Sequence, residues 1–424
     1  MVEDIPKGWR KGKLSELVHF PESGGRPKGG ASSETGKIPS IGAEFITRDG
    51  RLHYDGMKFI PEDYFINMNS GKLHDGDILI CKDGALTGKV AFYENSPYDE
   101  AVVNEHVFIL RPLNGDCRKF IFYSLQSDAG QNKVRKIMTG SAQPGINTTF
   151  PRYYDLLIPT KKEQEKIAEI LSTIDENIFE TERIVNECER IKKGLMQTLL
   201  LKGILGKHKK FKNTELGEIP EEWEIKDMKD LGSFDKGKGI SKKELIEIGI
   251  PCVRYGEIYT SHHFKIKKFF SFIDKDTSAE STLILKGDIL LAGSGETLED
   301  IGKSVVYLGK EEAYAGGDTI IFRPKKQNSL YLCYVLNSGV IREQINRLGQ
   351  GHSVVHLYPR QLMNVQIPIP PIEEQDEIAN ILDELDYKID IEKEKRNAIL
   401  KLKLSLMQKL LSGEIRVMVN KNGS

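Results

Sequence analysis

Few residues in this chain have the types and spacing that catalysis or tight cofactor binding requires. A Walker loop, which cradles phosphates, needs a glycine five residues before a Gly-Lys-Ser or Gly-Lys-Thr triplet. Gly302, Lys303 and Ser304 supply the triplet, but Thr297 occupies the position of the first glycine. The chain also lacks the Asn/Asp-Pro-Pro-aromatic motif of amino-methyltransferases and a glycine-rich donor loop. We therefore expect no catalytic residues and no cofactor, and we interpret the Gly-Lys pair as a turn or as a lysine close to phosphate.

Side chains that bind metals are not grouped either. The pair His262-His263 has no Cys, Asp or Glu at ligand spacing, which predicts a surface pair rather than a metal site. The cysteines are scattered without a CxxC pair, at Cys81, Cys117, Cys188, Cys252 and Cys333. This pattern predicts neither a disulfide framework nor a zinc site, and it favours a reducing cytoplasm.

The length and charge of the chain suggest a soluble protein of two or three domains. Its 424 residues include 61 basic and 62 acidic ones, for a net charge of −1. This balance argues against a chain that coats nucleic acid indiscriminately, but it allows a specific reader with one basic face. The N-terminus has no apolar signal region, and the longest apolar stretch, 195–205, is broken by Lys202 and Gly203. We therefore expect a cytoplasmic protein without a membrane span.

The sequence repeats itself at about half its length, which indicates two tandem copies of one unit. LMQTLL at 195–200 returns as LMQKLL at 406–411, an offset of 211 residues. Glu163-Gln164 and the strand-like Gly76–Leu79 recur at the same offset. Near the start, the Ile-Pro-x-x-Trp motif that ends at Trp9 returns, ending at Trp223, at an offset of 214. The drift between the two offsets is typical of small insertions in loops.

Each copy begins with a mixed segment of roughly 150 residues, the usual size of one domain. Buried strands followed by glycine-rich loops are predicted within 75–84 and 286–295. Further strands that end at a proline are predicted within 101–112 and 316–324, and short helices near 116–138 and 329–347. This composition predicts a head of mixed α/β structure in each copy.

Each copy ends in a long helix. Residues 161–201 contain no proline and a single glycine, and a second segment of the same kind begins after Pro371. Apolar residues recur every three or four positions, so helices roughly 60 Å long should bury their stripes against each other. The acidic residues Glu163, Glu165, Glu169 and Asp175 are interpreted as solvated or as partner contacts. The residues expected to pair the helices are Ile167, Ile170, Ile174, Ile178, Val185, Leu195, Ile378, Ile381, Leu385, Ile389, Leu402 and Leu406.

The expected fold is α+β: two tandem mixed α/β heads, separated by two long helices that pair as an antiparallel coiled coil with pseudo-two-fold symmetry. A head at each end of a rigid helix pair would match two DNA half-sites in opposite orientations. The predicted boundaries are a first head at 1–158, a first helix at 159–204, a linker at 205–218, a second head at 219–370, a second helix at 371–412 and a tail at 413–424.

The repeated motifs resemble those of the specificity subunits of Type I restriction–modification systems over nearly the whole chain. The resemblance lies in the Ile-Pro-x-x-Trp motifs, the Gly-Asp-Ile-Leu strands, the Leu-Met-Gln-x-Leu-Leu endings and, above all, the helix starts at 163–175 and 374–386. It implies that each head is a target recognition domain that reads one half of a bipartite double-stranded DNA site. It also implies that the helices dock two methyltransferase subunits, which would hold S-adenosylmethionine, and that endonuclease/translocase subunits join the complex.

Candidates for DNA contact are polar and basic residues on loops. The loops at 140–152 and 349–360 rank first because they contain amides and hydroxyls and little acid. Gln143, Asn147, Gln350, His352 and Ser353 are predicted to contact bases, with Thr148 beside them, while Arg152 and Arg360 are predicted to contact phosphates. The other candidates are Arg26, Lys28, Arg48, Lys89, Lys238, Lys242, Arg254 and Lys303. Tyr255 and Tyr259 are either interface aromatics or part of the core.

Two other functions remain open at this point. One is a coiled-coil scaffold whose heads bind protein, and the other is a DNA methyltransferase or nuclease acting alone. The missing donor and metal motifs argue against the enzyme. The bases recognised and the length of the spacer between them cannot be predicted from one chain.

Overall fold

The computed structural model describes residues 5–33, 36–113, 117–140, 144–350 and 355–418. The chain divides into two compact units. The first comprises Met1–Glu182 with Glu394–Ser424, and the second comprises Arg183–Lys393. Both long helices cross from one unit to the other. Each unit therefore contains one head together with about half of each helix.

The head of the first unit is built on two small sheets. One is antiparallel in the order β2-β8-β5-β6, and the other has the order β4-β3-β7 with β3 and β7 parallel. A separate pair, β1-β9, joins the two ends of the head. The strands are β1 (Arg10–Lys13), β2 (Glu22–Ser23), β3 (Ile38–Ile41), β4 (Phe59–Ile60), β5 (Ile78–Cys81), β6 (Val90–Phe92), β7 (Val102–Val103), β8 (Val107–Leu110) and β9 (Asp155–Ile158), and the helices are α1 (Glu62–Asn67), α2 (Arg118–Gln126) and α3 (Asp128–Ile137).

The head of the second unit repeats this topology, with one more strand in its second sheet. Its sheets have the orders β13-β21-β17-β19 and β15-β14-β20-β16, and β12-β23 corresponds to β1-β9. The strands are β10 (Phe211–Thr214), β11 (Gly217–Pro220), β12 (Glu224–Asp227), β13 (Gly232–Lys236), β14 (Ile250–Val253), β15 (Ser271–Ile273), β16 (Thr282–Ile284), β17 (Ile289–Ala292), β18 (Ser294–Gly295), β19 (Ser304–Val306), β20 (Ala313–Ala315), β21 (Thr319–Pro324), β22 (Val355–His356) and β23 (Gln366–Ile369). The helices are α5 (Met228–Leu231), α6 (Tyr255–Thr260), α7 (Lys275–Glu280), α8 (Ser329–Leu336), α9 (Gly339–Leu348) and α10 (Pro359–Leu362).

The Ile-Leu of the repeated Gly-Asp-Ile-Leu motif begins a central strand of a four-stranded sheet in each head, β5 or β17. Every residue of either strand is buried, and each pairs antiparallel with the strand that ends at the repeated Arg-Pro, β8 or β21. Strands covered on both faces are continuously apolar rather than alternating. This is why both strands are unbroken runs of apolar residues, ILIC and ILLA.

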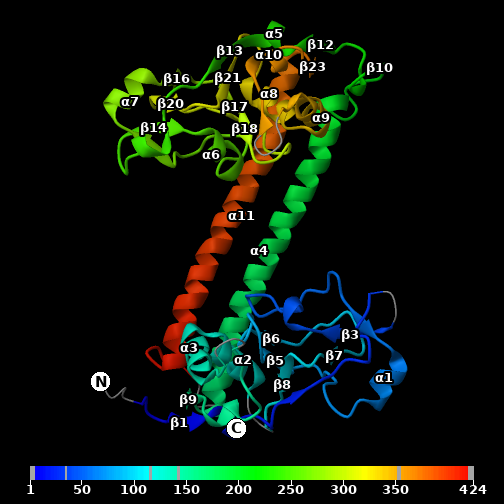
Figure 1. Ribbon diagram of the computed structural model, residues 1–424, viewed down its shortest axis with the longest axis vertical. Helices are drawn as coiled ribbons and strands as arrows, with labels where there is room; N and C mark the ends of the chain where they lie inside the picture. The colour runs from blue at the N-terminus through cyan, green and yellow to red at the C-terminus, as the bar shows by residue number, and fades with distance from the viewer. Residues whose placement is uncertain (1–4, 34–35, 114–116, 141–143, 351–354, 419–424) are drawn as a thin grey trace. The chain divides into compact units, whose positions relative to one another are not determined.

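The two long helices are α4 (Lys161–Lys202) and α11 (Ile372–Ser412), and they pack antiparallel, as predicted (Figure 1). The contacts within each unit show this direction. In the first unit Asp175 of α4 pairs with Lys403 of α11, while in the second Lys192 pairs with Asp386. The predicted fold class, with two mixed heads and two antiparallel helices, is confirmed.

The apolar stripes of the helices are buried largely by the heads, and only in part by each other. Ile167 and Leu171 of α4 and Leu410 of α11 belong to the core of the first head. Ile378 and Leu382 of α11 belong to that of the second, together with Leu199 and Leu200 of α4. A small separate cluster of Val185, Cys188 and Ile389 lies between the helices in the second unit.

The exposure of the predicted pairing residues requires one correction. Leu402 is 51% exposed, and the buried position beside it is Lys403. The helix turns this face toward the first head, and an ion pair takes the place of a leucine there. Ile170, Ile174, Leu195, Ile381, Leu385 and Leu406 are half-buried, whereas Ile167, Ile178, Val185, Ile378 and Ile389 are buried.

The segment predicted as a linker, 205–218, is partly structured. It contains β10, and its end contributes to β11, which pairs with β10 in a hairpin. Across the described parts of the chain, every helix is too short or too polar to cross a membrane.

Candidate nucleic-acid interface and its helical frame

Each head is fixed to its long helix by a buried tryptophan–glutamate hydrogen bond. Trp9 Nε1 donates to Glu163 Oε2 at 3.1 Å, and Trp223 Nε1 donates to Glu374 Oε2 at 3.2 Å. Glu163 and Glu374 are 4% and 2% exposed. The expectation that Glu163 is solvated or contacts a partner subunit is therefore wrong. A buried carboxylate requires partners, and the single tryptophan of each copy supplies one.

Each of these two buried glutamates also pairs with a cationic side chain, which is a different residue type in the two units. In the first unit Arg416 Nη2 lies 2.6 Å from Glu163 Oε1. Burial opposes ionisation of Glu163, but its hydrogen bonds to Arg416, Thr160 and Trp9 outweigh burial and lower its pKa. In the second unit His208 Nε2 lies 2.7 Å from Glu374 Oε1. Burial disfavours the charged ring, but hydrogen bonds to Glu374 and Glu222 outweigh this and raise the pKa of His208.

A second polar group joins each head to both long helices. Asp175 of α4 accepts a hydrogen bond from Tyr123 Oη at 2.8 Å and lies 2.6 Å from Lys403 Nζ. The expectation of a solvated or partner-facing Asp175 is therefore also wrong. In the second unit Asp386 of α11 accepts from Tyr334 Oη at 2.6 Å and lies 2.5 Å from Lys192 Nζ.

An arginine–aspartate pair holds the turn before the central strand of each head. Arg111 Nε donates to Asp77 Oδ1 at 3.0 Å, and Arg323 Nε donates to Asp288 Oδ1 at 2.8 Å. Both aspartates are buried. These are the Asp of Gly-Asp-Ile-Leu and the Arg of Arg-Pro. The repeat revealed these residues in the sequence, but not that they contact each other.

The candidate base-reading loop of the first head borders a hollow. Asn147 and Thr148 line it together with Lys82, Ser23 and Thr139. Asn147 is exposed, and its Oδ1 accepts hydrogen bonds from Thr149 N and Oγ1, which leaves its amide nitrogen available. Lys82 was not among the residues predicted to contact DNA, although Lys89, a few residues later in the chain, was.

The other candidates of the first head do not share that hollow. Lys28, Arg48 and Arg152 are exposed, and Lys89 is half-buried. Arg26 Nε donates to Glu105 Oε2 at 2.8 Å, so its charge already has a partner. Gln143 lies outside the described residues.

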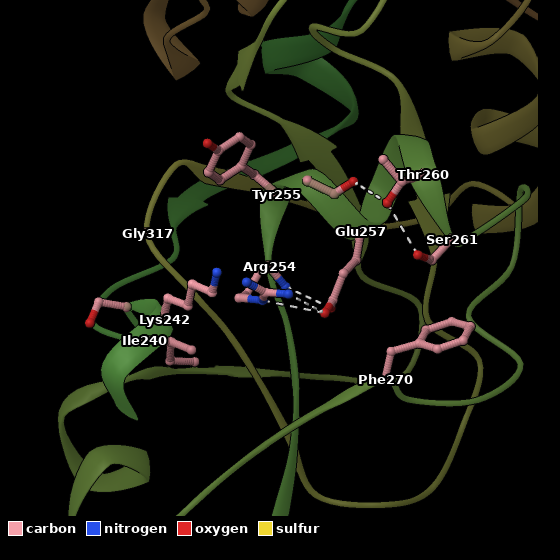
Figure 2. A pocket seen from close by; sticks show the side chains of 11 residues that line it. Ile240, Lys242, Arg254, Tyr255, Glu257, Thr260, Ser261, Phe270 and Gly317 are labelled. Carbon is pink, nitrogen blue, oxygen red and sulfur yellow. Dashed lines mark hydrogen bonds and ion pairs between the residues drawn. The ribbon is translucent and has the colours of Figure 1, made fainter. Parts of the chain in front are cut away.

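In the second head, Lys242 and Arg254 line one hollow, with Tyr255, Thr260 and Ser261 (Figure 2). Arg254 is held in place, since Nη2 donates to Glu257 Oε1 at 3.1 Å and Nε donates to Ser271 Oγ at 3.2 Å. The Lys242 side chain is exposed and adds the hollow's other positive charge.

Tyr255 and Tyr259, predicted as either interface aromatics or core residues, have different environments. Tyr255 lines the hollow of Figure 2, whereas the half-buried Tyr259 packs against the core of the second head.

Lys303 lies in a separate hollow of the second head, with His262, His263, Asn337 and Arg342. His262 is 6% exposed, so the prediction of a surface histidine pair is wrong for this member; its ring lies 5.3 Å from that of Phe270. Burial lowers the pKa of both histidines and lowers that of Arg342 to about 10. Arg342, which sequence reasoning missed, adds a second cation beside Lys303.

The remaining candidates, Lys238, Gln350 and Arg360, are exposed. The Arg360 guanidinium lies over the ring of Tyr358, 5.8 Å from its centroid. His352 and Ser353 lie outside the described residues. The candidates are thus spread over several surfaces of each head.

Comparison with known proteins agrees with this architecture. The family model described as "Type I restriction modification DNA specificity domain" matches residues 6–190 and again 220–401. The Type I restriction enzyme MjaVIII specificity subunit of Methanocaldococcus jannaschii is 27% identical, covering 97% of this chain and 94% of that protein. The EcoKI specificity subunit of Escherichia coli is 26% identical over 47% of this chain and 44% of its own length.

Solved structures show the same fold. The Type I restriction–modification S subunit from M. genitalium superposes with a TM-score of 0.62, at 15% sequence identity and with 97% of each chain covered. Two matches of one family model cover the two copies that the internal repeat defines. The chain therefore belongs to the family of DNA specificity subunits of Type I restriction–modification systems.

Proposed function

We propose that each head reads one half of a bipartite DNA sequence and that the paired helices set the spacing between the halves. The observation that carries this proposal is the duplication of a complete reading unit. Both copies have a four-stranded sheet of corresponding strand order, the same tryptophan–glutamate bond and the same tyrosine–aspartate–lysine group. Two equal readers joined by helices of fixed length suit a target made of two separated parts.

The hollows of the two heads are the proposed contact surfaces. In the first head, Asn147, Thr148 and Lys82 combine an amide, a hydroxyl and a cation, the groups that read base edges and hold phosphates. In the second head, Lys242 and Arg254 share a hollow with a tyrosine and three serine or threonine side chains. The chain has a net charge of −1, so local cations such as Lys82 and Lys242, rather than its overall charge, would draw DNA to the heads, because Arg254 is already paired with Glu257.

Specificity subunits are non-catalytic parts of their complexes, so the chemistry requires partner proteins. We propose that two methyltransferase subunits dock on the long helices and that endonuclease/translocase subunits complete the assembly. Exposed apolar residues on the helices support docking there: Phe179 and Ile191 on α4, and Tyr387, Leu402 and Leu404 on α11. We expect the complex to work in the cytoplasm, where it meets cellular DNA.

The direct test is to sequence methylated bases in DNA exposed to the chain in complex with its methyltransferase subunit. The expected result is methylation at one motif with two defined halves and a spacer of constant length. Selection from random duplexes by the same complex should recover the same motif. Methylation without sequence preference, or at one continuous short motif, would contradict the proposal of two separate reading heads. It would favour the alternative of a coiled-coil scaffold whose heads bind protein.

A paired substitution tests the hollow that contains Lys303. Lys303→Ala should weaken binding to all DNA sequences alike and lower the salt dependence of binding by about one phosphate contact, because a lysine there would meet the backbone. Lys310→Ala, at an exposed position in the same head, is the matched control and should leave both quantities unchanged. If Lys303→Ala altered the preferred bases instead, the assignment to phosphate would be wrong.

A further inference from the structure

We propose that the two tyrosine–aspartate–lysine groups, Tyr123–Asp175–Lys403 and Tyr334–Asp386–Lys192, set the register of the long helices and thereby the spacer length that the complex accepts. We call them the register triads. The inference rests on the proposed function, because it concerns the distance between the half-sites. It assigns the six residues a positioning role rather than contact with DNA.

Each register triad connects three elements at one point. In the first unit the tyrosine is on α2 of the head, the aspartate on α4 and the lysine on α11. In the second unit the tyrosine is on α8, the aspartate on α11 and the lysine on α4. The roles of the long helices are thus exchanged, as a duplicated antiparallel arrangement requires.

Both triads obey a single antiparallel register. Along α4, Asp175 and Lys192 are 17 residues apart, and along α11, Asp386 and Lys403 are also 17 residues apart. One alignment of the two helices therefore satisfies both lysine–aspartate pairs. Because each residue of a helix rises about 1.5 Å, a slip by a single turn would separate both pairs by more than 5 Å.

Stability does not explain these buried charges. The side chains of Lys192 and Lys403 are 9% and 7% exposed. Burial lowers the pKa of Lys192 even with Asp386 beside it, which shows the cost of removing the ammonium from water. Buried ion pairs add little net stability over apolar residues of similar size, and their best-attested use is to fix register.

The apolar contacts between the helices specify register less strictly. The cluster that lies between them apart from the head cores contains Val185, Cys188 and Ile389. Such contacts have no preferred direction and tolerate small shifts. The lysines, by contrast, are held on several sides: Lys192 Nζ lies 3.6 Å from the centroid of the Phe264 ring, and Lys403 Nζ lies 3.3 Å from Gln126 Oε1.

The test replaces one triad by apolar residues in the full complex. The variant Lys192→Met, Tyr334→Phe, Asp386→Leu removes every polar member, so no buried charge is left unpaired. The matched control, Lys393→Met with Glu189→Leu, removes an ion pair between the same helices whose side chains are 40% and 48% exposed. Both variants are compared with the unmodified chain by thermal unfolding and by sequencing methylated bases in a DNA library of graded spacer lengths.

We expect the triad variant to unfold at the same or a higher temperature, yet to lose spacer precision. The preference for the correct spacer over spacers one base pair longer or shorter should fall roughly tenfold, equivalent to about 1.4 kcal/mol. The control should keep the original preference. If the triad variant folds and keeps the same preference, the proposal is wrong.

A charge exchange keeps the test decisive if the apolar variant does not fold. Lys192→Asp alone should broaden the accepted spacers, and adding Asp386→Lys should restore precision by re-forming the pair. Failure of the second substitution to restore precision would overturn the proposal. Failure of the proposed function is seen separately, because the unmodified complex would then show no bipartite motif at all.

Discussion

The two buried glutamates show how one duplicated site can respond differently to pH. Glu163 and Glu374 hold the same place at the start of their helices and bind the same tryptophan of their own copy. Arg416 neutralises the first and His208 the second. An arginine stays charged at any physiological pH, whereas a histidine loses its charge near neutrality.

This difference predicts a pH-dependent stability of the second unit. The pKa of His208 is raised in the folded chain, so its stabilisation is complete below the ordinary histidine pKa of about 6.5 and is lost as pH rises through the folded value. Urea unfolding of the second unit should therefore occur at lower concentrations as pH is raised from about 6 to 9.

His208→Arg, which copies the arrangement of the first unit, is the matched control for this pH dependence. It should flatten the dependence over the same range, because an arginine remains charged throughout. An equal pH dependence in the variant would show that groups other than His208 cause it.

A second pair of residues tests which face of α11 is buried. Leu402 is 51% exposed, whereas Leu410 is 2% exposed within the core of the first head. Leu410→Ala should lower the free energy of unfolding by about 2–5 kcal/mol, because it leaves a cavity. Leu402→Ala in the isolated chain should change it by less than about 0.5 kcal/mol. Similar losses for the two variants in urea unfolding would contradict the assignment of faces.

At the scale of elements, the sequence predicts the strands that carry a repeated motif and the helices that have periodic apolar residues. The central strands β5 and β17 follow from the repeated motif, and the long helices follow from proline-free segments with apolar spacing. The face of each helix was harder to predict. The three- and four-residue spacing of apolar side chains predicted that Leu402 faces the partner helix, but the buried neighbour is Lys403. A search for apolar residues cannot find a buried lysine.

The candidate site was less predictable for a related reason. Loop composition selected Asn147 and Thr148 but not Lys82, which the fold brings to the same hollow from another loop. Similarly, Arg254 was predicted to contact DNA from its place in a polar loop, but its guanidinium binds Glu257, three residues later in the chain. Partners depend on loop conformation, and one sequence does not fix that conformation.

The aspartate and the lysine of the register triads are equally far apart on α4 and on α11. This equality leads to a prediction about the lengths of the helices. A heptad inserted after Glu182 extends α4 alone by about 10.5 Å, so the two lysine–aspartate pairs can no longer form in one register. We expect the single insertion to shift or abolish DNA recognition and to lower the unfolding temperature. A second heptad after Lys393 in α11 restores equal lengths and should restore most of that temperature. Unchanged spacer preference after the single insertion would refute the role of the helices as a ruler.

At the scale of the whole molecule, duplication explains how one chain could recognise two different sequences. Each unit has its own sheets, its own core and its own bonds to the helices. The residues that join the heads to the helices, namely the tryptophans, the buried glutamates and the register triads, recur in both copies and form a common frame. The polar loops differ between the copies. Such a division would allow the loops to change their target without disturbing the frame.

Exchange of heads between related chains tests this independence. Residues 1–158, the proposed first head, would be replaced by the corresponding head of a related specificity subunit that keeps a tryptophan and a tyrosine at the positions of Trp9 and Tyr123. Those two residues carry the hydrogen bonds to Glu163 and Asp175, so the new head should dock on the helices in the same way.

Sequencing of methylated bases should then show one altered half-site, with the other half-site and the spacer length retained. The reciprocal exchange of residues 219–370, with Trp223 and Tyr334 matched, should alter the other half alone, because that head makes its own equivalent bonds to the helices. If either exchange changed both halves, the heads would be reading DNA jointly. The duplicated frame would then serve some purpose other than holding two independent readers.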